Sequence, residues 1–330
     1  GNDFTFLLSS SFLMKFYTDV MGVNAAIVGM VMMIARFVDA FTDVGMGQIV
    51  DHSKPNKDGK FRPWIKRMCG PVAIASFLIY QSGLAGMPYG FKVAWLFVTY
   101  ILWGSIFYTS INIPYGSMAS AISSDPKDRA DLSTWRTIGS TLANMVIGVA
   151  TPMVAYVVVD GKTVMSGSRM TIIAGVFSIC AILCYIVCFK LTSERVAVPA
   201  SNQKISASAI FKSIFTNKAL LGIIVAAIFV LLSQLTVLNL AGYVYPNVYG
   251  NAAAQSTASL LGTVVMLVVC APFASKLSAK FGKKELAMGS SIFSALVWLV
   301  CLIWRPASVW GFVACYILAN IGMGFFNTII

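Results

Sequence analysis

Charged residues are scarce in this sequence. They make up 11% of its 330 residues, whereas 58% are hydrophobic and the mean hydropathy is +0.80. A soluble domain carries about a quarter charged residues, so this chain cannot cover its surface in water. The shortage excludes a soluble fold and predicts a polytopic α-helical membrane protein.

Histidine and the common catalytic motifs are also lacking. The single histidine, His52, lies in a polar loop, which excludes a histidine proton relay inside a membrane. HExxH, paired histidines and G-x-S-x-G do not occur, and no large polar segment is present that would form a signalling domain. We therefore expect neither an enzyme with catalytic residues nor a receptor.

The seven cysteines form no CxxC pair and lie in or beside apolar runs. Cys180, Cys184 and Cys188 share one helix face, but small, soft side chains of this kind usually fill apolar cores. We interpret them as core residues, and we expect no metal site beyond the binding of a transported ion.

Long apolar runs are what the sequence has in abundance. Runs of about twenty residues are typical of membrane-spanning helices. They predict ten spans, at 4–18, 24–49, 68–87, 93–118, 136–159, 169–190, 219–245, 254–275, 286–304 and 307–330. Because the first and last spans look cut, we expect a longer parent protein with about twelve spans, of which the C-terminal ones are missing here.

The basic residues follow the loops between these spans. Seventeen Lys and Arg residues fall in the loops after spans 2, 4, 6 and 8, and four fall in the opposite set. Cytoplasmic loops carry such an excess of positive charge, so span 1 is predicted to run from inside to outside. The net charge of +12 thus reports topology in a cell membrane, most simply a bacterial inner membrane, and no nucleic-acid partner is expected.

The longest polar interruption divides the chain. It predicts an N-terminal six-helix half at 1–190, a cytoplasmic middle loop at 191–218 and an incomplete C-terminal half of about four spans at 219–330. The basic loop after span 2 has a weaker echo after span 8, which suggests a duplicated half. Repeated halves are typical of secondary transporters, whose substrate sites lie near the membrane midplane between them.

Ionisable residues lie inside span 2, in the stretch "RFVDAFTDVGMG" at 36–47. Asp39 and Asp43 are four residues apart and therefore share one helix face. Counted from Asp51, they lie roughly 18 Å and 12 Å along the helix, at membrane depth, where each charge costs several kcal/mol. Arg36 and Asp39 either neutralise each other as a structural ion pair or take part in function. Asp43 has no cation one turn away and is interpreted as functional.

Other polar residues lie at similar depth in neighbouring spans. They are Asp3 in span 1, Thr109 and Asn112 in span 4, and Arg136 in span 5. Carboxylates with a hydroxyl or amide suit a small monovalent cation. The same groups with an arginine suit a polyol or sugar, which needs directional donors and acceptors. A cation and a polar solute in adjoining sites form the physical basis of symport, since each raises the affinity for the other.

Several stretches resemble one transporter family, the glycoside–pentoside–hexuronide:cation symporters of the major facilitator superfamily, which include the melibiose permeases. The likeness covers essentially the whole chain, and its specific motifs lie in the first five spans. They are "GNDFTFLLSSSFLMKFYTDV", "ARFVDAFTDVGMGQIVD" followed by "GKFRPW", and "TYILWG" with "NIPYGSM". The resemblance implies the major facilitator fold, with two six-helix halves.

The resemblance also implies roles for individual residues. It places Asp39 and Asp43 in the cation site, with Thr42 and Thr109 as neighbouring ligands. It places Asp3 and Arg136 at the sugar.

Three positions depart from the melibiose permeases. Asn112 replaces a sugar-binding aspartate, Gly116 replaces a stacking tryptophan, and Asn2 replaces a lysine. We keep Asn112 and Gly116 as substrate-site positions, but melibiose itself is not expected.

The function expected from the sequence is import of a sugar or glycoside by symport through alternating access. The coupling ion is expected to be Na⁺ or H⁺, with Li⁺ as a further candidate, and no other cofactor is expected. The partners are the sugar, the monovalent cation and the lipid bilayer, with a monomeric functional unit. The alternative is a major facilitator carrier for a non-sugar solute such as a lipid or drug, which would need an apolar cavity.

Overall fold

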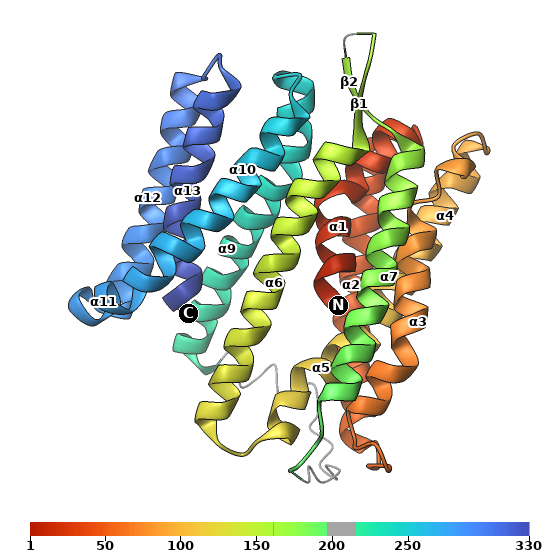
Figure 1. Cartoon of the computed structure of the whole chain (residues 1–330), viewed down its shortest axis with the longest axis vertical. Helices are drawn as coiled ribbons and strands as arrows, with labels where there is room; N and C mark the ends of the chain where they lie inside the picture. The colour runs from red at the N-terminus through yellow and green to blue at the C-terminus, as the bar shows by residue number, and fades with distance from the viewer. Residues whose placement is uncertain (161, 197–215, 330) are drawn as a thin grey trace. The chain divides into compact units, whose positions relative to one another are not determined.

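The computed structural model describes residues 1–160, 162–196 and 216–329 (Figure 1). Each predicted span appears there as a helical segment. Five of them are α1 (Asn2–Lys15, continued by η1, Phe16–Val20), α2 (Ala25–His52), α3 (Arg62–Ile79), α6 (Pro126–Ala155) and α7 (Gly167–Leu191). The others are α4–η3–α5 (Tyr89–Ile101, Leu102–Tyr108, Thr109–Ile122), α9–η4 (Lys218–Tyr243, Val244–Val248), α10–η5–α11 (Ala252–Val265, Met266–Cys270, Ala271–Phe281), α12 (Lys283–Trp304) and α13 (Val309–Ile329).

The predicted all-α membrane class is confirmed. Among the described residues, eight helices are long and apolar enough to cross a membrane. Helices α1 and α3 fall outside this set, because α1 has only 14 residues and α3 begins with the basic run that contains Arg62, Lys66 and Arg67. Large apolar side chains point outward along the spans; Phe41 on α2, for example, is 80% exposed. Such a surface suits contact with lipid.

Several predicted boundaries differ from the structure: α3 ends at Ile79 where the span was expected to continue to 87, and α6 begins at Pro126 where the span was expected to begin at 136. One span end has a different secondary structure. Residues 156–159, expected to complete the span at 136–159, instead form strand β1 (Tyr156–Val159), which pairs antiparallel with β2 (Lys162–Met165) (Figure 1). Val159 is opposite Lys162, so two residues, Asp-Gly in the sequence, join the strands. Asp-Gly between two short runs that contain β-branched residues is a strong hairpin signal, and the apolar run of valines hides it.

The chain divides into two compact units. Unit 1 comprises Gly1–Ser140 and Gly167–Leu240, and unit 2 comprises Thr141–Ser166 and Ala241–Ile330. The boundaries fall within α6, at the start of α7 and near the end of α9. The halves expected at 1–190 and 219–330 remain a prediction. Most of the predicted middle loop at 191–218 lies outside the described residues.

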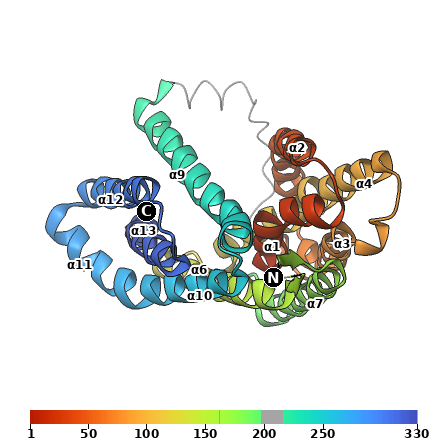
Figure 2. The same ribbon diagram turned by 90° about the horizontal axis from the view of Figure 1, so that it is seen from above.

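In unit 1, α7 packs against α1 and α3, while α2 packs against α4, η3 and α5 (Figure 2). Buried aromatic rings fill the interior where α1 ends. Phe16 meets Tyr80 edge to face at 5.2 Å, the hydroxyl of Tyr17 donates to the Ile79 carbonyl at 2.9 Å, and the hydroxyl of Tyr80 donates to the Leu8 carbonyl at 3.2 Å. These contacts fix α1 against α3.

The opposite end of unit 1 is tied together by Glu194, in the segment after α7. Its carboxylate accepts backbone N–H bonds from Lys60, Phe61 and Arg62 at 2.7, 2.8 and 2.9 Å. These groups form the start of α3, where a helix favours a negative charge. The Arg62 guanidinium in turn donates to the Phe189 carbonyl at 2.7 Å. The predicted cytoplasmic ends of α3 and α7 are thereby joined.

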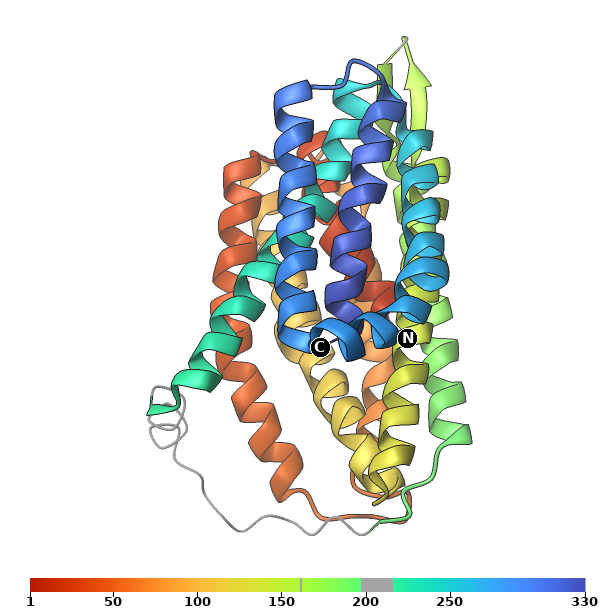
Figure 3. The ribbon, with the colours of Figure 1, turned by 90° about the vertical axis from the view of Figure 1, so that its left-hand side faces the viewer.

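Unit 2 is built on the pair α12 and α13, which run side by side in Figure 3, with α10 packed against α13. A small apolar core surrounds Tyr245, together with Ala254, Ala258 and Val313. The hydroxyl of Ser256 donates to the Val149 carbonyl of α6 at 2.9 Å.

Candidate functional site

Two pairs of side chains join α2 to the helix formed by α4, η3 and α5. The hydroxyl of Ser105 donates to Oδ1 of Asp39, and the hydroxyl of Thr109 donates to Oδ1 of Asp43 at 2.8 Å. Both pairs are separated by 66 residues. The two helices therefore lie in register, and the four-residue spacing of the carboxylates matches that of the hydroxyls.

Arg36 completes this arrangement one turn before Asp39. Its Nη1 lies 3.0 Å from Oδ2 of Asp39, and its Nη2 donates to the Tyr100 hydroxyl at 2.6 Å. The structural ion pair considered from the sequence therefore forms. We call Arg36, Asp39, Asp43, Ser105 and Thr109 the carboxylate ladder.

The charges of the carboxylate ladder do not cancel. The Asp39 side chain is 14% exposed and is neutralised by Arg36. None of the ion pairs among the described residues includes Asp43, whose only hydrogen-bond partner there is the Thr109 hydroxyl. With its acids ionised, the ladder carries a net charge of minus one beside the middle of α2, and a monovalent cation would balance it.

A cavity of about 310 Å³ opens beside the ladder. This volume lies at the lower end of the range of small-molecule sites. On one wall, the rings of Phe6 and Tyr108 stack with centroids 5.6 Å apart and an interplanar angle of 23°. The lining combines charged, polar and aromatic side chains: Phe6, Arg36, Asp39, Ala40, Asp43, Trp103, Gly104, Tyr108, Thr109 and Asn112.

Part of the cavity wall is the π-helical segment η3, Leu102–Tyr108. Such segments are frequent at functional sites because they change the direction of the side chains. Here η3 presents Trp103, Gly104 and Tyr108 to the cavity and directs Ser105 to Asp39. Sequence reasoning missed Ser105, although its position four residues before Thr109 copies the spacing of the aspartates.

The other predicted cation ligand, Thr42, is placed differently. It is absent from the cavity lining, and its hydroxyl donates to the carbonyls of Val38 and Asp39 at 3.1 and 3.2 Å. Its role as a ligand remains a prediction. Among the described residues, no group of three or more His, Cys, Asp or Glu side chains could hold a metal ion. A cation bound here would therefore take hydroxyl oxygens besides the two carboxylates.

The predicted substrate residues are only partly brought together. Asn112 lines the cavity, whereas Asp3, Arg136 and Gly116 do not. Oδ1 of Asp3 accepts a hydrogen bond from the Ser140 hydroxyl at 3.0 Å, and Arg136 is exposed on α6. A Cβ added to Gly116 would meet no atom within 4 Å, so there is open space at this position.

Asn112 is also hydrogen-bonded to Asn2, a residue that does not line the cavity. Nδ2 of Asn2 donates to Oδ1 of Asn112 at 2.7 Å, and the Tyr185 hydroxyl donates to Oδ1 of Asn2. Two positions where the sequence departs from the melibiose permeases, Asn2 and Asn112, are thus hydrogen-bonded to each other. We call Tyr185, Asn2 and Asn112 the amide chain; it crosses from α7 through α1 to α5.

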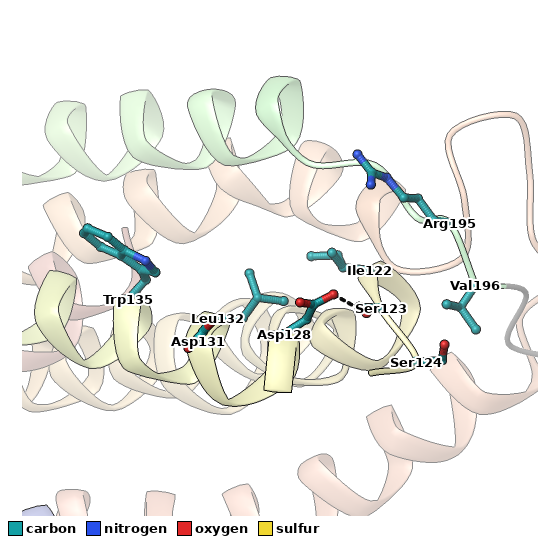
Figure 4. Close-up of a pocket in the computed structure, with 9 residues that line it drawn as sticks. All are labelled: Ile122, Ser123, Ser124, Asp128, Asp131, Leu132, Trp135, Arg195 and Val196. Atoms are coloured by element: carbon teal, nitrogen blue, oxygen red, sulfur yellow. Dashed lines mark hydrogen bonds between the residues drawn. The ribbon is translucent and has the colours of Figure 1, made fainter. Parts of the chain in front are cut away.

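A second hollow, of about 480 Å³, lies at the predicted cytoplasmic end of unit 1 (Figure 4). It is bounded by the end of α5, the start of α6 and the segment after α7. Oδ2 of Asp128 accepts a hydrogen bond from the Ser123 hydroxyl at 2.7 Å, and the nearby Trp135 is 71% exposed. None of the predicted site residues lines this hollow.

Comparison with known proteins shows that residues 2–330 match the family described as MFS/sugar transport protein. The uncharacterized symporter YjmB of Bacillus subtilis is 30% identical over all of this chain and 70% of its own length. The glucuronide carrier protein homolog of Escherichia coli is 28% identical with the same coverage. A putative 2,3-dihydroxypropane-1-sulfonate exporter of Escherichia coli is 29% identical over 98% of this chain and 69% of its own length.

Among solved structures, the nucleoside transporter NupG matches 99% of this chain and 78% of its own chain, with a TM-score of 0.53. At 16% sequence identity, this likeness concerns the fold alone.

Proposed function

Because this chain belongs to the MFS/sugar transport protein family, we propose that it imports a sugar or glycoside by symport with a monovalent cation. The family makes it a membrane transporter and not an enzyme, and its apolar helices place it in the cell membrane as a multi-pass protein. The coupling to a cation, the identity of the sugar and the inward direction are our proposal.

The observation that carries the proposal is the uncompensated charge of Asp43 on the cavity wall. An ionised carboxylate at membrane depth costs several kcal/mol unless a partner stabilises it. Arg36 supplies that partner for Asp39, whereas Asp43 has, within the part of the chain that the structure describes, only the hydroxyl of Thr109. A bound Na⁺, or a proton on the carboxyl group, would remove this cost. Asp43 is therefore the group whose state changes when the coupling ion binds.

The substrate would bind in the same cavity. Asn112 offers an amide there, and the stacked rings of Phe6 and Tyr108 offer an apolar surface for the face of a sugar ring. Because the cation and the sugar would share one cavity, binding of either would favour binding of the other by a reciprocal coupling energy. Alternating access would then expose the loaded site first to one side of the membrane and later to the other.

The polar lining argues against the alternative cargo. A lipid or hydrophobic drug would need an apolar cavity, and burying the Asp43 carboxylate and the N–H groups of Asn112 against it would leave polar groups unpaired. The relatives include a symporter, a glucuronide carrier protein homolog and a putative 2,3-dihydroxypropane-1-sulfonate exporter. The direction of transport therefore needs a measurement of its own.

The test is transport by the purified protein in proteoliposomes, with Na⁺, Li⁺ or H⁺ gradients imposed in turn and in both directions. A panel of labelled mono- and disaccharides, including glucuronides, identifies the substrate. We expect accumulation of at least one sugar against its gradient when one cation flows inward. Uptake that is indifferent to all three cations would contradict the coupling.

A further inference from the structure

The amide chain of Tyr185, Asn2 and Asn112 lies behind the cavity wall. Both of its hydrogen bonds are donated in the same direction, from Tyr185 to Asn2 and from Asn2 to Asn112. Tyr185 and Asn2 are 3% and 8% exposed, whereas Asn112 is exposed to the cavity. The first two residues cannot touch a substrate in this geometry. Asn2 contacts Asn112, whose amide lines the cavity.

The single hydroxyl proton of Tyr185 sets the direction of these hydrogen bonds. Among the described residues, the only hydrogen-bond partner of this hydroxyl is Oδ1 of Asn2. If the Asn2 amide were turned round, its N–H would point at the hydroxyl, and the buried O–H would have no acceptor. A buried donor without an acceptor is costly. The tyrosine therefore fixes Asn2 with its oxygen toward α7.

The orientation of the Asn2 amide also fixes the orientation of the Asn112 amide. With its oxygen bound to Tyr185, Asn2 directs its N–H at Oδ1 of Asn112, 2.7 Å away. The oxygen of Asn112 is therefore occupied, and its own two N–H groups remain for the cavity. An aspartate at this position would present acceptors only, so the amide chain reverses the hydrogen-bonding character of this part of the wall.

We propose that Tyr185 and Asn2 are positioning residues that hold Asn112 as a hydrogen-bond donor to an acceptor oxygen of the transported solute. This inference rests on the proposed sugar transport and adds a selectivity rule to it. At the position that meets Asn112, the solute needs an atom that accepts a hydrogen bond, and a hydroxyl proton is not required.

The experiment uses analogues of the transported sugar in which one hydroxyl at a time is replaced by hydrogen or by fluorine. Fluorine accepts a hydrogen bond weakly and cannot donate one. Inhibition constants are measured by competition with uptake of the labelled parent sugar. At one carbon, the fluoro analogue should bind the wild-type protein about fivefold more tightly than the deoxy analogue.

Two variants should remove this preference by different routes. In Tyr185→Phe, the Asn2 and Asn112 amides are free to turn, and the ratio of the two inhibition constants should fall toward one. In Asn2→Asp, the new carboxylate can only accept, so Asn112 must turn its N–H groups toward it and present oxygen to the cavity. The ratio should fall in that variant too, while Tyr185 keeps an acceptor.

Tyr17→Phe is the matched control, because it also removes a buried tyrosine hydroxyl that bonds across helices, to the Ile79 carbonyl. It should keep the wild-type ratio, even where it lowers thermal stability. An unchanged ratio in Tyr185→Phe and Asn2→Asp, or no carbon at which the wild-type protein prefers fluorine to hydrogen, would overturn the inference and leave sugar transport intact. A wild-type protein that transports no sugar would refute the proposed function itself.

Discussion

The carboxylate ladder and the amide chain meet at one cavity, but the first contains charged groups and the second is made of neutral ones. The ladder keeps two carboxylates and one guanidinium beside the middle of α2 and leaves one negative charge unbalanced. The amide chain crosses the neighbouring helices with neutral groups only, each held in a fixed orientation. A net charge selects for an ion, whereas a fixed dipole selects for the hydrogen-bonding pattern of a neutral or polar solute. The comparison assigns ion binding to one region and solute selectivity to the other.

The largest effect should come from removing the unbalanced charge. Asp43→Asn keeps the hydrogen bond with Thr109 possible but leaves no net charge for a cation. Cation-driven accumulation of sugar should be lost, while some downhill exchange persists. Asp51→Asn, which removes an exposed carboxylate near the end of the same helix, serves as the control. Normal accumulation in Asp43→Asn would show that Asp43 is only structural.

The next effect concerns the balanced part of the ladder. Arg36→Gln leaves Asp39 beside Asp43 without its counter-charge, and we expect the free energy of unfolding to fall by about 1–2 kcal/mol, since Arg36 is half exposed. Thermal unfolding in detergent would detect this as a lower Tm. Adding Asp39→Asn to Arg36→Gln should restore much of the loss. A double variant as unstable as the single one would show that Arg36 stabilises the protein through Tyr100 instead.

A smaller effect is expected where the ladder contributes only a hydroxyl. Thr109→Val removes the group that orients Asp43 and offers an additional oxygen to a cation, so the affinity for the coupling ion should weaken roughly tenfold. Thr109→Ser keeps the hydroxyl and should stay close to wild type. The cation dependence of transport gives both values. Equal affinities in the valine and serine variants would place Thr109 outside the ion site.

The smallest effect separates the two regions most cleanly. Gly116 lies one helical turn after Asn112, and a Cβ there meets nothing within 4 Å. Gly116→Ala should therefore fold normally, leave the cation affinity unchanged and alter the sugar affinity by less than about threefold. Sugar and cation titrations on the same preparation check this. A change in cation affinity larger than the change in sugar affinity would contradict the assignment of ion binding to the ladder and of solute selectivity to the amide chain.

The sequence predicted the ladder better than the amide chain, for a physical reason. Asp39 and Asp43 are close in sequence, and the period of the helix alone places them on one face. Thr109 and Asn112 were assigned to the same cavity because they lie at a similar depth in a neighbouring span, and the family resemblance added their roles. Ser105 escaped notice because a serine in an apolar helix usually bonds to its own backbone.

Contacts between residues far apart in the sequence could not be predicted from the sequence. Tyr185 and Asn2 are separated by 183 residues, and no local pattern links them. The bond between Glu194 and the start of α3 is hidden in the same way. The ten helical segments were predicted because hydropathy reports each helix by itself. The hairpin at 156–165 was missed because its valines continue an apolar run.

Coupled binding of the cation and the sugar through Asp43 can be measured directly. Sugar binding is measured by calorimetry on the purified wild-type protein and on Asp43→Asn, with and without Na⁺ or Li⁺ and across a range of pH. For the wild-type protein, we expect that one cation tightens sugar binding and that the sugar tightens binding of that cation by the same factor. In Asp43→Asn, this dependence should disappear while sugar binding remains. A sugar affinity that is the same under all ionic conditions in the wild-type protein would show that Asp43 does not couple the cation to the sugar.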